Sequence, residues 1–200
     1  MELIGEVAAK DHERAVATIG AAFESDPMFE WMFPVPETRP NLARVFAAVP
    51  VRYGLRFGRL TGSGETRAVA IWIPPEQPFS ILGMVRSGFL AMPFRIGFGS
   101  FRRFMSANDV MGRYHKKHVP EPHWYLFAVG VAPEVQGQGL GSALIREGLS
   151  LADAAGHPCY LETSNERNVP YYERFGFRVL GSAPLGKDGP PGWAMRRDAR

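Results

Sequence analysis

A glycine-rich segment between a predicted strand and a predicted helix carries the clearest chemistry in the sequence. It reads Val129-Gly130-Val131-Ala132-Pro133-Glu134-Val135-Gln136-Gly137-Gln138-Gly139-Leu140-Gly141-Ser142. Glycines at the alternate positions 137, 139 and 141 leave backbone N–H groups open at the start of a helix, where the helix dipole also favours negative charge. A side chain at these positions would hold an anion away from the amides. The segment therefore predicts a cradle for a pyrophosphate, with a simple glycine-rich turn as the alternative.

Three known phosphate-binding patterns compete for this segment. A P-loop is excluded because no lysine follows the glycines. A dinucleotide fingerprint is disfavoured, since Ser142 stands where it needs a third glycine or alanine and the motif comes after at least two predicted strands. The third pattern, Q-x-x-G-x-G, fits Gln136, Gly139 and Gly141.

This third pattern, preceded by Val-x-Val-x-Pro, resembles the pyrophosphate loop of the GCN5-related N-acetyltransferases (GNAT). A second motif follows about 30 residues later, where residues 165–177 are similar to the family's Asn followed by Tyr-Glu-x-x-Gly-Phe. A closer similarity to the puromycin N-acetyltransferase branch is clear from about residue 121 onward. It is weakest over residues 78–118, where the family places walls of the acceptor site, so the resemblance leaves the substrate open.

The resemblance implies that acetyl-CoA binds along the strand that contains the first valines of the motif. Backbone groups of Val129 and Val131, on either side of Gly130, would pair with the pantetheine arm, and an amide near Val129 would point at the acetyl oxygen. Asn165 or Asn168 would also hold this arm, with Asn168 favoured. The pyrophosphate would lie on the amides of Gln136, Gly137, Gln138, Gly139, Leu140, Gly141 and Ser142.

The resemblance also suggests the catalytic side chains. Tyr172 occupies the position of the family's general acid and would also touch the cofactor, although aromatic packing is an alternative; its neighbour Tyr171 is expected in the core. Glu162 ends an apolar strand, where a carboxylate is costly unless it lines a cavity. We therefore expect Glu162 to act as the base, directly or through water, and to contact the substrate, unless an amide or arginine simply ties it up.

The aromatic segment after the first predicted helix is expected to line the acceptor pocket. Phe29 and Trp31 are the expected substrate-binding residues, supported by Asp26, Glu30 and Phe33. The implied reaction transfers an acetyl group directly to a primary amine of a small, aromatic or antibiotic-like molecule in a ternary complex. A protein, peptide or polyamine acceptor, a non-catalytic acyl-CoA sensor and a nucleic-acid-binding module are the alternatives.

Hydrophobic periodicity predicts the elements that position these residues. We expect helices over 10–25, with Asp11 as its N-cap, and over 37–57, kinked by Pro50. A hairpin is expected from the strands 59–61 and 66–73 with a turn at Gly62-Ser63-Gly64, and irregular helices over 78–118. The remaining elements are expected at 124–131 (strand), 142–154 (helix), 158–163 (strand), 168–174 (helix), 177–180 (strand) and 193–196 (strand).

This order of elements predicts an α/β (α+β) fold, because strands joined through helices run parallel. The resemblance adds a mixed central sheet, flanked by helices and splayed between its fourth and fifth strands. Residues 1–200 are expected to form a single domain, in which residues 25–57 and 78–118 build the acceptor site.

Composition narrows the remaining possibilities. The chain has 200 residues, is 46% hydrophobic and contains one cysteine, Cys159, so an intrachain disulfide scaffold is excluded and a buried thiol is expected. Acidic residues near the start argue against a secretory signal, and no apolar window reaches the length of a membrane span, so a cytoplasmic protein without a membrane partner is expected.

Charge and histidine spacing argue against two further site types. The 20 acidic residues are dispersed among 23 basic ones, and the basic patch at 113–118 is typical of a solvated helix face, so no nucleic-acid partner is expected. His115, His118 and His123 lack a second pair of ligands, so no metal site is expected. The sequence leaves a monomer and a homodimer equally open.

Overall fold

A mixed sheet of seven strands forms the centre of the structure, a computed structural model that describes residues 4–63 and 65–200. Along the sheet the strands follow the order β1-β2-β3-β4-β5-β7-β6, and only β4 and β5 pair in parallel. Their bounds are Ile4–Glu6 (β1), Arg59–Ser63 (β2), Ala68–Ile73 (β3), Trp124–Val131 (β4), Cys159–Thr163 (β5), Arg178–Pro184 (β6) and Pro191–Arg197 (β7).

Strand β3 shows why helices cover both faces of the sheet. All six of its residues are buried, and they alternate between two hydrophobic clusters. Ala68, Ala70 and Trp72 pack with residues of α7 (Leu140–Ala154) and α8 (Asn168–Glu173). The odd-numbered positions pack with α1 (His12–Phe23) and α3 (Arg39–Phe57). A strand buried on both faces needs an apolar run, and the segment Ala-Val-Ala-Ile-Trp-Ile supplies one.

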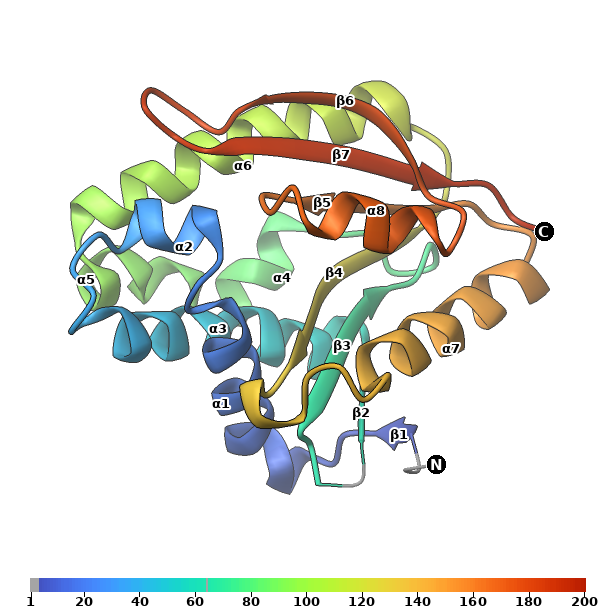
Figure 1. The fold of residues 1–200 in the computed structure, drawn as a ribbon, viewed down its shortest axis with the longest axis horizontal. Helices are drawn as coiled ribbons and strands as arrows, with labels where there is room; N and C mark the ends of the chain where they lie inside the picture. The colour runs from blue at the N-terminus through green and yellow to red at the C-terminus, as the bar shows by residue number, and fades with distance from the viewer. Residues whose placement is uncertain (1–3, 64) are drawn as a thin grey trace.

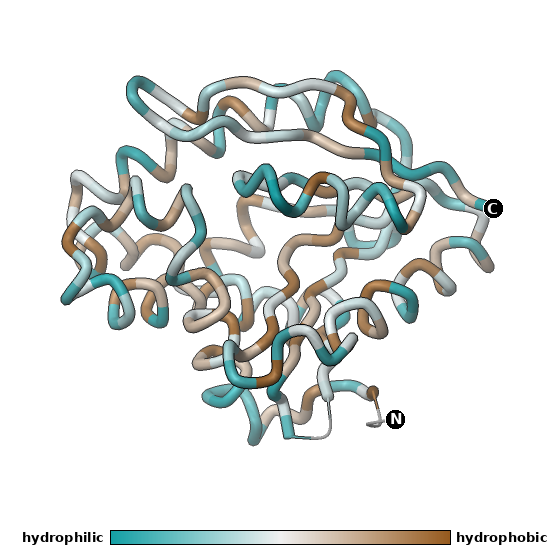
Figure 2. The backbone as a smooth tube through the Cα atoms, in the orientation of Figure 1, coloured by the Kyte–Doolittle hydropathy of each residue, from teal (hydrophilic) through white to brown (hydrophobic). Residues whose placement is uncertain are grey.

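Three short helices and the long α6 build a second, aromatic-rich layer beyond α3. They are α2 (Pro27–Met32), α4 (Ile81–Arg86), α5 (Met92–Ile96) and the long α6 (Phe98–His118). Phe29, Phe33, Phe46 and Phe104 form edge-to-face ring contacts that join α2, α3 and α6. Figure 1 shows α6 running behind the β6–β7 hairpin, whose tip is hydrophilic (Figure 2).

The strands β4 and β5 separate part-way along their length. Pairing runs from Trp124 opposite Cys159 to Leu126 opposite Leu161 and then stops, whereas β4 continues for five more residues to Val131. In Figure 1 β4 and β3 turn away from the β5-β7-β6 half of the sheet. The splayed mixed sheet expected from the sequence is therefore confirmed.

Most elements lie where periodicity places them, with local differences at the ends. Asp11 occupies the N-cap of α1, but its side chain makes no capping hydrogen bond. Gly62 and Ser63 belong to β2 and not to the hairpin turn, while Gly64 lies outside the described residues. The helix α3 continues through Pro50, and α7 begins at Leu140, two residues before the expected start. The three-residue strand β1 was not predicted, because it is too short to show a period.

Among the residues that the structure describes, no helix combines the length and the apolar character needed to cross a membrane.

The close approach of α7 to β3 generates a stability prediction. A Cβ atom added to Gly148 would lie 2.2 Å from Cε2 of the fully buried Trp72. We expect Gly148→Ala to lower the free energy of unfolding by roughly 1–3 kcal/mol or more, because overpacking displaces a rigid ring. Urea denaturation measures this change.

The matched control is Gly112→Ala in the middle of α6, where an added Cβ meets nothing within 4 Å. This control should gain about 0.5–1 kcal/mol, because alanine favours helix. Equal effects of the two substitutions would contradict the packing described for Trp72.

Candidate active site

The point at which β4 and β5 separate opens into a large cavity. Its volume is about 1080 Å³, and most of its lining is aromatic or aliphatic. Leu126, Phe127, Ala128 and Val129 line it from β4, while Glu162, Thr163 and Ser164 line it from the end of β5. The separated edges of β4 and β5 therefore face one apolar cavity.

The glycine-rich loop lies between the end of β4 and the start of α7. Gly137 (φ 78°) and Gly139 (φ 84°) adopt left-handed conformations that an L side chain would strain, and an added Cβ at either position would meet nothing within 4 Å. The first amides of a helix have no carbonyl partner within that helix, and α7 begins directly after Gly139. The Gln136 side chain donates to the carbonyl oxygen of Val131 (3.1 Å) and so ties the loop to its strand. The loop thus leaves space around Gly137 and Gly139 at the start of α7, and its role as an anion site stays a prediction.

Glu162 lies in the cavity with its side chain 19% exposed. The hydroxyl of Tyr125, on the neighbouring strand β4, donates to Oε2 of Glu162 at 2.6 Å. Burial raises the pKa of Glu162, and the hydrogen bond from Tyr125 partly opposes this rise. Burial, together with the charge of Glu162, raises the pKa of Tyr125 well above its usual value, so the phenol stays protonated and donates.

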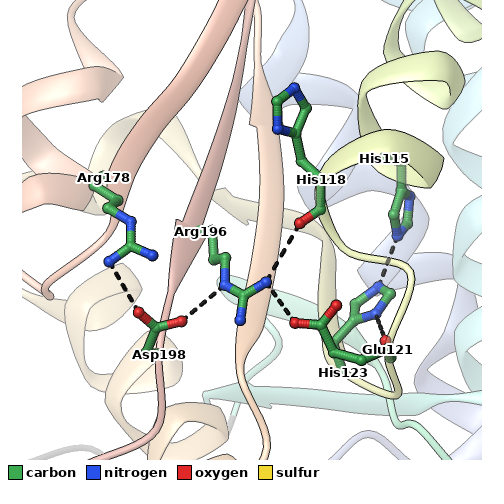
Figure 3. A network of polar contacts seen from close by, with 7 residues as sticks. All are labelled: His115, His118, Glu121, His123, Arg178, Arg196 and Asp198. Atoms are coloured by element: carbon green, nitrogen blue, oxygen red, sulfur yellow. Dashed lines mark hydrogen bonds and ion pairs between the residues drawn. The ribbon is translucent and has the colours of Figure 1, made fainter.

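Two histidines adjoin this carboxyl group. Nδ1 of His115, on α6, lies 4.0 Å from Oε1 of Glu162, and Nε2 of His115 lies 2.7 Å from Nε2 of His123 (Figure 3). Nδ1 of His123 lies 2.7 Å from the backbone oxygen of Glu121. The His115 ring stacks on Tyr160, with ring centroids 4.3 Å apart. Burial first, and then His123, lowers the pKa of His115 to about 4.

Tyr172 lies on α8 and lines the same cavity, 7% exposed. Burial raises the pKa of its phenol, so the hydroxyl keeps its proton at neutral pH. Its neighbour Tyr171 packs against the same core, and its hydroxyl lies 3.1 Å from Oγ of Ser142 at the start of α7. The two tyrosines thus connect α8 to the cavity and to the glycine-rich loop, respectively.

The two asparagines proposed for the pantetheine arm occupy different surroundings. Asn168 lines the cavity and donates from its side chain to Oγ1 of Thr163 at 3.4 Å. Oδ1 of Asn165 instead accepts from the backbone N–H of Arg167 at 3.1 Å, and Asn165 is not among the lining residues described. The geometry therefore favours Asn168 of the two.

The aromatic segment is divided between the cavity and the core. Asp26 and Phe29 line the cavity, and the Asp26 carboxylate caps α2 through the amide of Met28 (2.9 Å). Trp31 is not among the lining residues that the structure describes; its ring packs against the hairpin glycines near 186–189. Phe33 is 1% exposed and belongs to the core. Trp31 therefore does not reach the chamber expected to hold the acceptor, because the β6–β7 loop covers its ring.

Cys159 is buried, and the arginines of β7 are paired with carboxylates. The thiol of Cys159 is fully buried, as expected, and burial raises its pKa to about 12. Within the described part of the chain, no group of three or more His, Cys, Asp or Glu side chains is arranged to hold a metal ion. Arg196 bridges Glu121 and Asp198 (Figure 3), and Arg197 binds Asp153 at 2.7 Å.

Sequence reasoning missed the partners of Glu162. Tyr160 and Glu162 are two residues apart on β5, so their side chains lie on the same face of the sheet. Tyr125 is opposite Tyr160 in the parallel register, so the three side chains meet at one place. The spacing of Tyr160 and Glu162 can be seen in the sequence. The sequence does not show the β4–β5 register that places Tyr125 beside Glu162, or the packing of α6 that places His115 there.

Three comparisons agree with this geometry. Residues 89–177 match the model of the acetyltransferase (GNAT) family. An uncharacterised N-acetyltransferase of Schizosaccharomyces pombe is 29% identical over 194 residues, which cover 91% of this chain and 76% of the relative. Mycothiol acetyltransferase of Streptomyces scabiei is 38% identical over 82 residues, which cover 40% of this chain and 27% of that protein.

The fold has a close counterpart among solved structures. A Corynebacterium glutamicum protein described as histone acetyltransferase HPA2 and related acetyltransferase superposes with a TM-score of 0.70 at 23% identity. The match covers 100% of this chain and 98% of that one. The family-model match and the long relative together support a GNAT-family N-acetyltransferase, and the solved structure shows that the chain has the same fold.

The contact between Tyr125 and Glu162 generates a prediction about ionisation. Tyr125→Phe removes a hydrogen bond to the carboxylate form, so the pKa of Glu162 should rise further. Titration of the side-chain carboxyl carbon by ¹³C NMR measures this shift. In the control Tyr114→Phe, which removes a hydroxyl bonded to Ser182, the pKa of Glu162 should stay unchanged. A lower pKa of Glu162 in Tyr125→Phe would contradict the donor role of Tyr125.

Proposed function

We propose that this GNAT-family enzyme transfers the acetyl group of acetyl-CoA directly to a primary amine of a small, partly aromatic molecule. One observation carries the proposal: Val129, Glu162 and Tyr172 line a single cavity at the point where β4 loses its neighbour. These are an unpaired strand edge, a buried carboxyl group and a protonated phenol. Together they meet the needs of a reaction that joins an amine to an acyl group and releases a thiol.

The residues present fit coenzyme A at two places. Gly137 and Gly139 leave their amides uncovered, so the loop at the start of α7 suits a pyrophosphate. The β4 edge after Leu126 leaves backbone groups at Val129 and Val131 that a pantetheine amide would pair with. Asn168 would hold the same arm from α8. When bound, acetyl-CoA supplies an acetyl group already activated as a thioester.

Glu162 and Tyr172 divide the proton transfers between them. As the bond between the amine nitrogen and the acetyl carbon forms and the carbon–sulfur bond breaks, Glu162 accepts the proton that the amine loses. Tyr172 gives its phenolic proton to the departing sulfur. The raised pKa of Glu162 brings this base closer to neutral pH, which suits a proton acceptor. The phenol of Tyr172 carries its proton at neutral pH, as a proton donor must.

The cavity lining supports an apolar amine over a polyamine. Phe29, Phe79 and Phe127 are among the many rings that line it. Besides Glu162, three carboxylates line the cavity, and each already has partners: Asp109 pairs with Arg113, Glu121 pairs with Arg196, and Asp26 accepts hydrogen bonds from Ser164 and from the amide of Met28. An acidic trough of the kind that a polyamine needs is therefore not formed by the described lining. This lining is consistent with the similarity to the puromycin N-acetyltransferase branch, which also implies an aromatic acceptor.

Substitution of the proposed base tests the activity. With an amine that the wild-type enzyme acetylates, found by thiol release across aromatic amines, aminoglycosides, polyamines and peptides, Glu162→Gln should lower kcat/KM roughly 10²–10⁴-fold. The wild-type kcat/KM should rise with pH through the raised pKa of Glu162, because only the carboxylate accepts a proton. Glu162→Gln should lose this rise.

The control is Glu173→Gln, which alters an exposed carboxylate at the end of α8 and should behave as wild type. An unchanged pH profile in Glu162→Gln would remove Glu162 from the role of base. Tight binding of coenzyme A without turnover on any amine would favour a non-catalytic sensor instead.

Substitution in the loop tests the cofactor site independently of turnover. Gly139→Ala forces a side chain into a left-handed conformation at a cost of about 1–2 kcal/mol, so the loop should shift its amides away from the anion. Coenzyme A binding, measured by calorimetry, should weaken about tenfold. Gly156→Ala, at a similar positive φ beyond the far end of α7, should leave binding unchanged. Equal Kd values for all three proteins would contradict the assignment of the loop.

A further inference from the structure

The histidine pair beside Glu162 has fixed donor and acceptor roles. A backbone carbonyl oxygen only accepts, so His123 must carry its proton on Nδ1 to bond to Glu121. Nε2 of His123 is then an acceptor, and the 2.7 Å contact requires that His115 donate from its own Nε2. Nδ1 of His115 is left as an unprotonated nitrogen, and it is the atom that lies 4.0 Å from Oε1 of Glu162.

Both histidines line the cavity, and His123 lies next to a partly exposed loop. His115 lies on α6 and lines the cavity, and His123 precedes β4 at the rim formed by residues 119–123. Figure 3 shows the two rings in line between α6 and the Glu121 segment. Beyond them, the Glu121 side chain is 41% exposed. A path of titratable nitrogens therefore leads from the buried carboxyl toward solvent.

We propose that His115 and His123 form a proton relay that returns Glu162 to its carboxylate form after each acetyl transfer. The inference rests on the proposed function, because it needs Glu162 as the base. Neither histidine is assigned to the reacting atoms; both act through Glu162. The alternative role is purely structural, in which the rings only fill space beside Tyr125 and Tyr160.

The relay moves one proton in total. The proton on Glu162 passes to Nδ1 of His115, the Nε2 proton of His115 passes to Nε2 of His123, and His123 gives up its hydrogen bond to Glu121 and releases its Nδ1 proton to water. Each ring then holds its proton on the other nitrogen, so both rings must rotate or exchange that proton with water before the next cycle. The 4.0 Å gap is longer than a hydrogen bond, so the first transfer needs a rotation of the carboxyl group or one bridging water.

The surroundings keep the resting rings neutral. Glu162 and Tyr160 face His115 from β5, Tyr125 faces it from β4, and His123 faces it from the loop before β4. Glu121 and Arg196 lie beside His123. Burial lowers the pKa of both histidines, so both rings are neutral at pH 7, and His115 can accept a proton at Nδ1 only as it passes its Nε2 proton to His123. A ring with a high pKa would instead retain the proton.

Kinetic comparison of matched variants tests the relay. His115→Gln and His123→Gln keep polar side chains but cannot pass a proton between two ring nitrogens. Each should lower kcat by about tenfold, less than the loss of the base itself, with KM for acetyl-CoA unchanged. Because the two rings act in series, the double variant should be no slower than either single one. His118→Gln is the control, because the His118 ring stacks on Tyr114 of the same helix and is not part of the proposed relay.

Three readouts separate a relay from a structural role. The pH dependence of kcat should shift in His115→Gln and His123→Gln, and the solvent deuterium isotope effect on kcat should increase. Added imidazole should restore activity to His115→Ala but not to Glu162→Gln. Unshifted pH profiles, additive losses in the double variant, or no rescue by imidazole would overturn the relay.

Absence of turnover on every amine would overturn the proposed function. A separate measurement tests the relay even in that case. Long-range ¹H–¹⁵N NMR of the histidine rings at pH 7 should find His115 protonated at Nε2 and His123 at Nδ1. Protonation of His115 at Nδ1 would overturn the relay, because the acceptor nitrogen facing Glu162 would be blocked.

Discussion

The separation of β4 from β5 after Leu126 is the constraint on which the rest of the structure depends. Buried backbone donors and acceptors are costly when unpaired, so a strand that loses its neighbour inside a protein needs another partner. Here the split opens the cavity, puts the β4 edge within it and sets Glu162 at the end of the shortened pairing. The role proposed for that edge in holding an extended pantetheine arm follows from this one break in the sheet.

The surroundings of Glu162 set catalytic use against stability. A carboxyl with a folded-state pKa above its unfolded value binds its proton more tightly in the folded protein, so the folded state loses stability as pH rises through that pKa. The hydrogen bond from Tyr125 limits this loss, and the neutral histidine pair adds no compensating positive charge at pH 7. A carboxylate whose negative charge is only partly compensated is a better proton acceptor than a carboxylate held in a structural ion pair.

The sequence predicted features that depend on neighbouring residues better than features that depend on residues far apart in the chain. Elements with a strong period or glycine signal, such as β3, β4 and the loop before α7, were predicted because each is encoded locally. Trp31 was expected in the acceptor pocket but packs against the β6–β7 loop, a contact between segments more than 150 residues apart. The partners of Glu162 depend on the β4–β5 register and on the position of α6, and the histidines were considered only as metal ligands. Long-range packing therefore decided the details of the site.

The account is tested most directly by a crystal structure of the protein with acetyl-CoA. It predicts a pantetheine arm paired with the backbone of Val129 and Val131, a pyrophosphate on the amides of residues 137–142, and a thioester in the cavity near Glu162 and Tyr172. Coenzyme A bound elsewhere, or a β4 edge closed by side chains with the loop amides turned away from the phosphates, would contradict it.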